Sequence, residues 1–173
     1  MGGSPASHRD IADRILDAAF KYHIDTFVET GTYQSESAMW AARLFGVVHT
    51  IELDPTLYFD AKDHEKDFPP GRLNVHHGRS EVVMNWLLPT LRTPICWLDA
   101  HSMGNDSSGS AVLAELDVIS LHFPEIPIVF IDDVMWFELR TKGWPTVVEL
   151  KAKLKALGLG CEKFHDVFIA ERL

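Results

Sequence analysis

Residues 25–36 read DTFVETGTYQSE, and this stretch decides the fold. Its first part, 26–29, is a short β-rich run, and a helical pattern follows at about 35–45. The residues singled out in the turn between them are Gly31, Thr32, Tyr33 and Ser35. Glycine permits a close backbone approach, and hydroxyl residues can form hydrogen bonds at a helix N-terminus. A strand, a tight turn and a helix predict the first unit of a parallel α/β sheet, although a turn that binds nothing would use the same residues.

The alternation of β-rich runs and helical patterns continues along the chain. The predicted strands are 26–29, 47–52, 73–76, 95–98, 126–131, 161–164 and 167–171. The predicted helices are 11–22, 35–45, 55–66, 81–91, 111–122 and 145–157. This order, which closes with a hairpin, predicts a doubly wound α/β sheet with helices on both faces. We expect one domain over 1–173, with residues 1–10 flexible, because the length suits a single domain.

Composition excludes several classes of partner. The formal net charge of −9 repels nucleic-acid phosphates, and Lys151, Lys153 and Lys155 have the spacing of a solvated helix face, so no nucleic-acid partner is expected. No apolar run approaches the ~18 residues that span a bilayer, so no membrane partner is expected. Cys96 and Cys161 lie far apart in apolar segments, which favours a reducing cytoplasm over a disulfide framework.

An acidic residue ends the second predicted strand. Glu52 lies at the tip of IELDP, where a carboxylate can accept hydrogen bonds from the ribose hydroxyls of a nucleoside. The alternative is a strand-end carboxylate that only caps the helix beginning near Pro55. We favour the ribose contact for Glu52 and the helix cap for Asp54.

The next two strand ends carry further ionisable side chains. The fourth predicted strand runs into Asp99 and His101, and the fifth runs into Asp132 and Asp133. Because the carboxyl ends of neighbouring parallel strands share one crevice, we expect these groups to converge. Crowded carboxylates favour a divalent cation, and oxygen ligands suit Mg²⁺, Ca²⁺ or Mn²⁺ better than Zn²⁺. Alternatively, one aspartate caps a helix while another binds a cofactor amine.

His101 is the candidate general base of this crevice. Its ordinary pKa of ~6.5 suits proton transfer near neutral pH. It could instead be a metal ligand or a hydrogen-bonding loop residue. Asp99 is counted with it among the catalytic residues and is assigned to the cofactor or the metal. The segment 102–110, SMGNDSSGS, is predicted to be a mobile loop that serves as a lid or as a plain connector.

An irregular aromatic stretch follows the fifth strand. Its large apolar residues are Met135, Trp136, Phe137 and Trp144. We expect ordinary packing from them, with an apolar wall for the acceptor or a dimer contact as the alternatives.

The chain resembles the class I S-adenosylmethionine-dependent methyltransferases. The resemblance rests on VETGTYQSES, TIELDP, HHGRSEVV, CWLDAH and VFIDD, which together span nearly the whole chain from Asp25 onward. It implies a Rossmann-like, seven-stranded sheet of order 3-2-1-4-5-7-6 with strand 7 antiparallel. It also implies a set of cofactor-binding residues: Glu29, Gly31, Thr32, Tyr33, Ser35, Glu52, Arg79, Ser80 and Asp99. Ser35 stands where this family usually has a second glycine, and Arg79 where it commonly has an aspartate beside the adenine.

The two acidic strand ends are similar to those of a metal-dependent branch of this family, the macrocin-type sugar O-methyltransferases. That similarity implies Asp99, Asp132 and Asp133 as ligands of Mg²⁺ and a small hydroxyl-bearing acceptor such as a sugar. This branch usually has longer acceptor-binding segments than this chain, and a homo-oligomer would be one way to complete the site.

Two other functions remain open at this point. The first is a metal-dependent hydrolase or hydroxylase-like protein that uses Asp-x-His and Asp-Asp. The second is a nucleoside-binding protein without catalysis.

Overall fold

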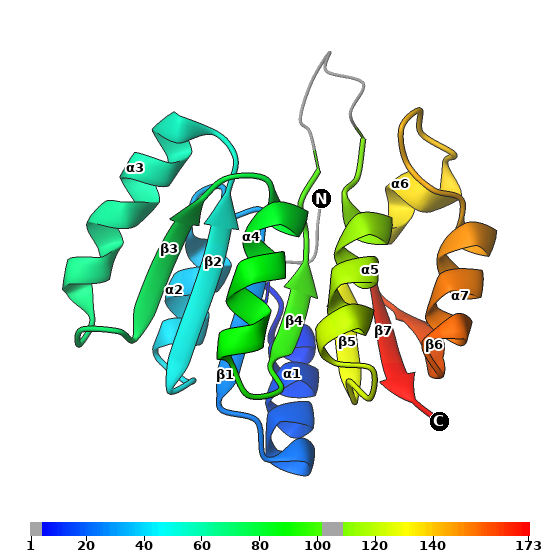
Figure 1. Ribbon diagram of the computed structural model, residues 1–173, viewed down its shortest axis with the longest axis horizontal. Coiled ribbons are helices and arrows are strands. Elements are labelled where there is room, and N and C mark those ends of the chain that lie inside the picture. Colours follow the sequence, from blue (N-terminus) through cyan, green and yellow to red (C-terminus); the bar gives the residue numbers. More distant parts are fainter. Residues whose placement is uncertain (1–4, 102–108) are drawn as a thin grey trace.

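The computed structural model describes residues 5–101 and 109–173, and Figure 1 shows their arrangement. The helices are α1 (Arg9–Tyr22), α2 (Glu36–Ala42), α3 (Pro55–Asp63), α4 (Ser80–Leu87), α5 (Val112–His122), α6 (Val134–Glu138) and α7 (Val147–Ala156), with 3₁₀ turns at His64–Asp67 and Leu88–Thr90. The strands are β1 (Thr26–Thr30), β2 (Val47–Glu52), β3 (Leu73–His77), β4 (Ile95–Leu98), β5 (Ile128–Ile131), β6 (Leu159–Phe164) and β7 (Val167–Arg172).

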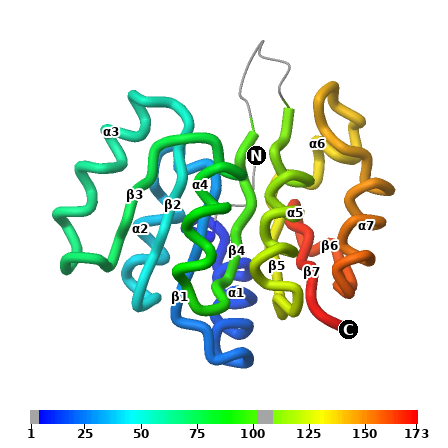
Figure 2. Tube along the Cα trace, viewed as in Figure 1, coloured from blue at the N-terminus to red at the C-terminus, as the bar shows by residue number. Residues whose placement is uncertain are grey.

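The strands form one seven-stranded sheet in the order β3-β2-β1-β4-β5-β7-β6. Strands β1 to β5 pair in parallel, whereas β7 is antiparallel to both β5 and β6. This is the strand order that the family resemblance implies. The carboxyl ends of the parallel strands all lie at the upper edge of the sheet in Figures 1 and 2.

The sheet has an apolar cluster on each face. The central strand β4 is buried throughout, and its alternate residues serve opposite faces: Cys96 and Leu98 face α4, α5 and α7, while Ile95 and Trp97 face α1 and α2. Burial on both faces explains why β4 reads as a continuous apolar run. The hydrophobic burial on each side fixes the strand ends relative to one another.

The element boundaries differ from the sequence expectation in a few places. β5 begins at Ile128 and not at 126, because Pro127 has no N–H to donate to a neighbouring strand. β6 begins at Leu159, α2 already ends at Ala42, and the short helix α6 was not predicted. Of the predicted loop 102–110, residues 102–108 lie outside the described residues.

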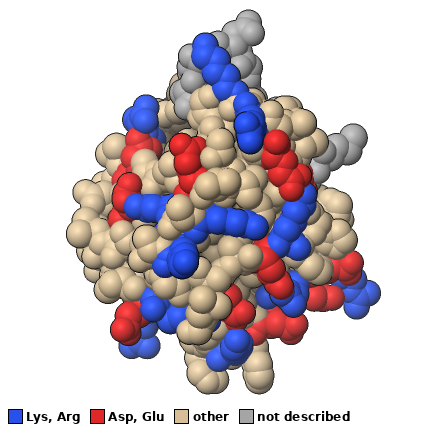
Figure 3. Space-filling view, turned by 90° about the vertical axis from the view of Figure 1, so that its right-hand side faces the viewer, with Lys and Arg blue, Asp and Glu red and all other residues tan. Residues whose placement is uncertain are grey.

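Charge on the surface is mixed. Figure 3 shows basic and acidic side chains interspersed on the α7 side of the molecule. Lys163 donates to Glu138 at 2.8 Å, and Lys153 pairs with Asp117. On α7 itself, Lys151 and Lys155 are exposed and Lys153 is half-buried beside Asp117, which agrees with the interpretation of these lysines as a solvated face. Among the described residues, no helix combines the length and the apolar character that crossing a membrane requires.

Gly31 sets the distance between β1 and β4. Its N–H donates to the carbonyl oxygen of Ile51 at 2.9 Å, and its φ is +81°. A Cβ at this position would lie 2.5 Å from the carbonyl oxygen of Asp99, so the backbone of β4 occupies the space of a side chain. Gly31 therefore lets the turn after β1 lie close to the end of β4.

We expect Gly31→Ala to lower the free energy of unfolding by about 2–4 kcal/mol, since it adds a backbone clash to an unfavourable left-handed conformation. Gly71→Ala is the matched control, because Gly71 has a similar φ of +79° and a Cβ added there would meet no atom within 4 Å. The control should lose only the conformational part, about 1 kcal/mol. Urea unfolding of the two variants measures the difference, and equal losses would contradict the packing role of Gly31.

Candidate active site

The carboxyl ends of β1, β2, β4 and β5 bring together most of the acidic residues that the sequence singled out. Glu29, Glu52, Asp132 and Asp133 are each at most 7% exposed. Buried carboxylates must find hydrogen-bond donors, protons or cations, because the charged form loses its hydration. The upper edge of the sheet therefore favours ligands that carry positive charge.

Glu29 is the deepest of these groups on the α2 side of the sheet. Its Oε2 accepts a hydrogen bond of 2.6 Å from the hydroxyl of Thr50, whose hydroxyl also lies 2.6 Å from that of Thr32. Burial raises the pKa of Glu29 to about 8, and the negative charges of Asp99 and Glu52 raise it further against the hydrogen bond from Thr50. A cationic ligand group at this edge would restore its ionised form.

Glu52 organises the turn after β1. Its Oε2 accepts from the backbone N–H of Tyr33 at 2.9 Å, and its Oε1 accepts from the N–H of Asp54 at 2.8 Å. Each carboxylate oxygen has a further lone pair for a ligand. Asp54 instead caps α3, since its Oδ1 accepts from the N–H groups of Thr56 and Leu57. The expected helix cap at Asp54 is therefore confirmed.

The turn itself is conformationally strained. Tyr33 has a φ of 47° and Ser35 a φ of 64°, both in the left-handed region that favours glycine. Ser35 thus occupies a glycine-like conformation at the position where the related family usually has glycine. Thr32 and Ser35 are buried, whereas the Tyr33 side chain is exposed.

Arg79 and Ser80, the two residues expected beside the adenine, differ in their exposure. Arg79 is exposed, and its Nε donates to Glu81 at 2.6 Å. Ser80, the first residue of α4, is buried. Of the two, only Ser80 points into the protein beside the strand ends.

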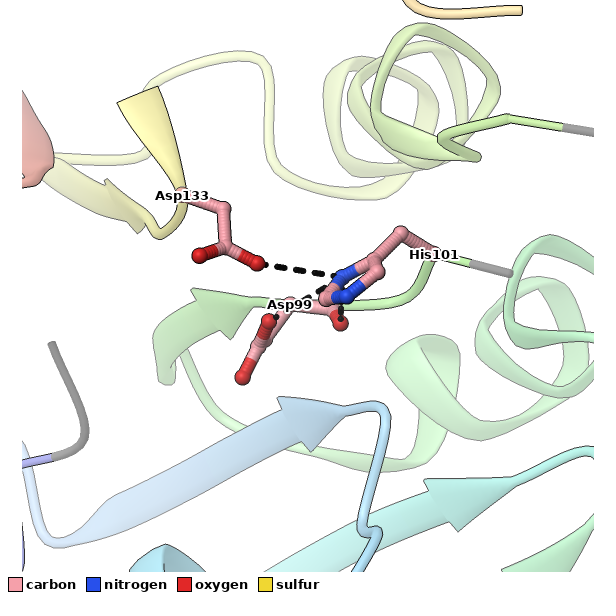
Figure 4. A group of neighbouring side chains, drawn as sticks. All are labelled: Asp99, His101 and Asp133. Carbon is pink, nitrogen blue, oxygen red and sulfur yellow. Dashed lines mark hydrogen bonds and ion pairs between the residues drawn. The ribbon is translucent and has the colours of Figure 1, made fainter. Parts of the chain in front are cut away.

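Asp99, His101 and Asp133 form a compact cluster, drawn in Figure 4. The His101 Nδ1 lies 3.4 Å from Asp99 Oδ1 and 3.4 Å from Asp133 Oδ2. It also lies 3.1 Å from the backbone carbonyl oxygen of Asp99, which can only accept a hydrogen bond. Nδ1 therefore carries the proton, and the imidazole is oriented with Nε2 as its basic nitrogen.

The same three residues could hold a cation. One ligand atom from each of Asp99, His101 and Asp133 lies within 4.8 Å of the others. Two carboxylates and an imidazole form a mixed oxygen and nitrogen donor set that suits Mn²⁺ as well as Mg²⁺. A cation bound through Nδ1 would have to displace the proton that Nδ1 carries.

Asp132, the third residue of the expected ligand set Asp99, Asp132 and Asp133, lines the same hollow as Asp99 and His101 but is not among the ligand atoms that lie within 4.8 Å of one another. Its Oδ1 accepts a 2.7 Å hydrogen bond from the N–H of Asp133. Asp133 has a φ of 60°, a left-handed conformation that aspartate tolerates better than most residues, and this turn aims its side chain at His101. The structure brings together Asp99, Asp133 and His101, with Asp132 supporting the turn.

The cluster alters the protonation of its members. Burial raises the pKa of Asp99 and of Asp133, against the opposing effect of His101. Burial alone would lower the pKa of His101, but the hydrogen bond and charge of Asp99 outweigh it and raise that pKa. His101 therefore holds a proton more readily than an isolated imidazole.

The sequence analysis did not single out Glu115, and it expected ordinary packing from Trp144 and Phe137, with an apolar acceptor wall or a dimer contact as the alternatives. The ring of Trp144 lies 5.3 Å from that of His101, and Phe137 packs edge-on against Trp144. Glu115 of α5 is fully buried and helps to line a hollow beside Asp99, Ala100 and His101. A carboxylate in the apolar pattern AVLAELDVI was the available signal for Glu115.

Solved structures share this architecture. The sequence matches no protein-family model and no curated protein. A Staphylococcus aureus protein provisionally named as a caffeoyl-CoA O-methyltransferase is 14% identical with a TM-score of 0.68, covering 93% of this chain and 82% of its own. The Bacillus cereus O-methyltransferase in complex with SAH is 14% identical with a TM-score of 0.66, covering 94% and 81%. SAM-bound CalS10, an amino pentose methyltransferase from Micromonospora echinaspora, is 15% identical with a TM-score of 0.61, covering 95% and 89%.

These likenesses define the class of fold. The chain has the Rossmann-like fold of the class I S-adenosylmethionine-dependent methyltransferases, with strand order 3-2-1-4-5-7-6 and an antiparallel seventh strand. The acidic cluster lies at the carboxyl edge of this sheet, where ligands bind in open α/β folds.

Glu29 should make stability depend on pH. Because its folded pKa of about 8 exceeds its ordinary 4.5, the folded state binds the proton more tightly than the unfolded chain does. Its contribution is fully present below about pH 4.5 and is lost as pH rises through about 8. Glu29→Gln does not titrate, so we expect this variant to gain up to several kcal/mol relative to the wild type between about pH 5 and about pH 8.5.

Urea unfolding at the two pH values measures this gain. Glu36→Gln on the exposed side of α2 is the matched control and should follow the wild type. Parallel curves for the wild type and Glu29→Gln would show that Glu29 is already ionised in the folded protein.

Proposed function

We propose that this protein transfers the methyl group of S-adenosylmethionine to a hydroxyl group of a small acceptor, a sugar or another natural product. The observation that carries the proposal is the convergence of Glu29, Glu52 and the Asp99–His101–Asp133 cluster at the carboxyl edge of a methyltransferase-like sheet. Neighbours of the same fold bind SAM or SAH according to their structures, which supports the same cofactor here.

The residues at this edge fit that cofactor. S-adenosylmethionine supplies an electrophilic methyl group on a sulfonium and carries a positively charged amine. The buried Glu29 and the half-buried Asp99 provide acidic groups toward such cations, and they lie near each other because β1 pairs in parallel with β4. Glu52 retains acceptor capacity toward ribose hydroxyls, because each of its oxygens accepts a single hydrogen bond from the protein.

His101 is the proposed base. Its Nδ1–H faces Asp99 and Asp133, and we assign to Nε2 the role of accepting the proton of the acceptor hydroxyl. The two carboxylates stabilise the imidazolium that forms, in the same way that an aspartate supports a catalytic histidine in other enzymes. Trp144 packs beside the His101 ring and contributes an apolar wall to the proposed acceptor site.

A divalent cation is the alternative use of the same cluster. Asp99, Asp133 and His101 would hold it, and it would acidify a bound acceptor hydroxyl. In that arrangement His101 is a ligand, and the acceptor proton leaves to another base or to water. The two proposals for His101 differ in whether cation binding depends on it.

The cofactor prediction concerns Glu52. Glu52→Ala should weaken S-adenosylmethionine binding by about 1–3 kcal/mol, because the ribose hydroxyls and the turn at Tyr33 lose a charged acceptor. Asp54→Ala is the matched control: it removes the α3 cap and should lower the free energy of unfolding by about 1 kcal/mol without changing cofactor affinity. Calorimetry measures both affinities, and equal affinity in Glu52→Ala and the wild type would overturn the ribose assignment.

The metal prediction separates the two candidate ligand sets. Titration with Mn²⁺ or Mg²⁺ should show weaker binding by about tenfold or more in Asp133→Asn, and little change in Asp132→Asn, whose side chain is turned to the backbone. Loss of binding in Asp132→Asn alone would instead favour the ligand set implied by the sugar O-methyltransferases. If the wild type binds neither ion, the metal proposal is wrong.

The same titration of His101→Ala tests whether His101 is a base or a ligand. If His101→Ala keeps the cation affinity of the wild type, the base assignment stands, and with an identified acceptor kcat should fall by about 10²- to 10⁴-fold. If His101→Ala loses the cation, His101 is a ligand.

A further inference from the structure

A second hollow lies between the end of α6 and the start of α7, next to the candidate active site. Its volume is about 240 Å³, several times the ~30 Å³ that one water molecule occupies in the liquid. A space of this size accepts a small ring or a short side group of a ligand. The residues that line it are Phe137, Glu138, Arg140, Thr146, Val147 and Val148.

Aromatic rings connect the second hollow to His101. Phe137 lines both this hollow and the one beside His101. The ring of Trp144 lies 5.3 Å from that of His101 and 4.9 Å from that of Phe137. Trp144 and Phe137 therefore form one aromatic wall that runs from the proposed base to the second hollow.

Arg140 is the cation of the second hollow. The other charged residue there, Glu138, is neutralised by Lys163, whose Nζ donates to both of its carboxylate oxygens at 2.8 Å. The guanidinium group of Arg140, by contrast, makes no hydrogen bond or ion pair with any residue of 5–101 or 109–173. The second hollow thus combines apolar walls with one positive charge that the described chain does not neutralise.

The backbone at Arg140 adds to this picture. Its φ is 54°, and its N–H donates to the carbonyl oxygen of Phe137 at 3.3 Å, where the loop from α6 to α7 turns. Glycine would adopt this left-handed conformation with less strain. Strained positions of this kind gather at ligand sites, because other contacts determine the backbone there. An arginine in such a place indicates a use for its side chain.

Opposite charges lie at the two ends of the aromatic wall. Three acidic residues line the hollow beside His101, namely Asp99, Glu115 and Asp132. An anionic group is repelled from that end and attracted to Arg140, whereas a neutral hydroxyl group can lie beside His101. A single guanidinium group matches a single negative charge, and its planar fork fits a carboxylate with two hydrogen bonds.

We propose that the second hollow binds a carboxylate group of the methyl acceptor through Arg140, while the apolar body of the acceptor lies along Trp144 and Phe137. This inference rests on the proposed function and narrows the acceptor to hydroxy acids with an apolar body. Arg140 would select such acceptors by their charge and fix their orientation, with the hydroxyl group toward His101.

Two probes that differ only in the carboxylate test this selection. They are 7-hydroxycoumarin-3-carboxylate, which has its hydroxyl and carboxylate at opposite ends of a flat ring system, and 7-hydroxycoumarin. Fluorescence titration at low ionic strength, with and without S-adenosylhomocysteine, measures both dissociation constants. The wild type should bind the carboxylate probe about three- to tenfold more tightly, a modest factor because Arg140 is exposed to solvent. In Arg140→Gln the two probes should bind alike, with the affinity for the neutral probe unchanged.

Matched variants separate charge from shape. Lys142→Gln removes an exposed cation of the same loop that does not line the second hollow, so the preference for the carboxylate should remain. Val148→Asp and Val148→Asn change a wall residue that is 77% exposed and differ from each other only in charge. The aspartate should abolish the preference by repulsion, and the asparagine should keep it. The ratio of the two affinities does not depend on a uniform loss of folded protein.

The possible failures are distinguishable. If the wild type binds the two probes alike or binds neither, or if Arg140→Gln keeps the preference, the carboxylate site is wrong. Calorimetry with S-adenosylhomocysteine tests the cofactor separately: if the wild type does not bind it, the proposed function fails. A preference that depends on Arg140 would in that case still support a carboxylate site, but not its role in methyl transfer.

Discussion

The burial of acidic side chains at one edge of an apolar sheet is the constraint on which the rest of the structure depends. Glu29, Glu52, Asp133 and Glu115 all lie at 7% exposure or less. Each charge removed from water must be offset by a donor, a proton or a cation. The turn after β1 and the orientation of His101 both follow from how these groups are satisfied.

The protein uses three physical solutions to this problem. Glu52 accepts backbone N–H groups on both oxygens, so the same carboxylate that suits a ribose also holds the turn at Tyr33. Asp99 and Asp133 share the imidazole of His101. Glu29 and Glu115 keep raised pKa values, so protonation is the main means of relieving their burial. A ligand that carries positive charge and hydrogen-bond donors would offer further partners to these carboxylates.

Close backbone packing makes this arrangement possible. Gly31 lets the end of β1 approach the carbonyl group of Asp99, which brings the turn after β1 against the strand that leads to His101. At Asp133 and Ser35 the chain adopts left-handed conformations without glycine. Strain of this kind persists where surrounding contacts determine the backbone, and here both positions lie in the candidate active site.

The sequence by itself determined the order of strands and helices, because apolar β-rich runs and helical periodicity depend on local burial. It also placed Glu29, Glu52, Asp99 and His101 at strand ends, and parallel strands bring such ends to one edge. The family resemblance added the strand order, including the antiparallel β7.

Only the tertiary structure decided which side chains face each other. Asp132 and Asp133 are adjacent in sequence, yet the left-handed turn sends Asp133 to His101 while Asp132 accepts from the backbone. Arg79 and Ser80 diverge in the same way at the start of α4. Glu115 comes from a helix remote in sequence from β1, and only the packing of α5 against Thr30 and Ser80 reveals it. Such choices depend on rotamers and long-range packing, which periodicity and spacing do not encode.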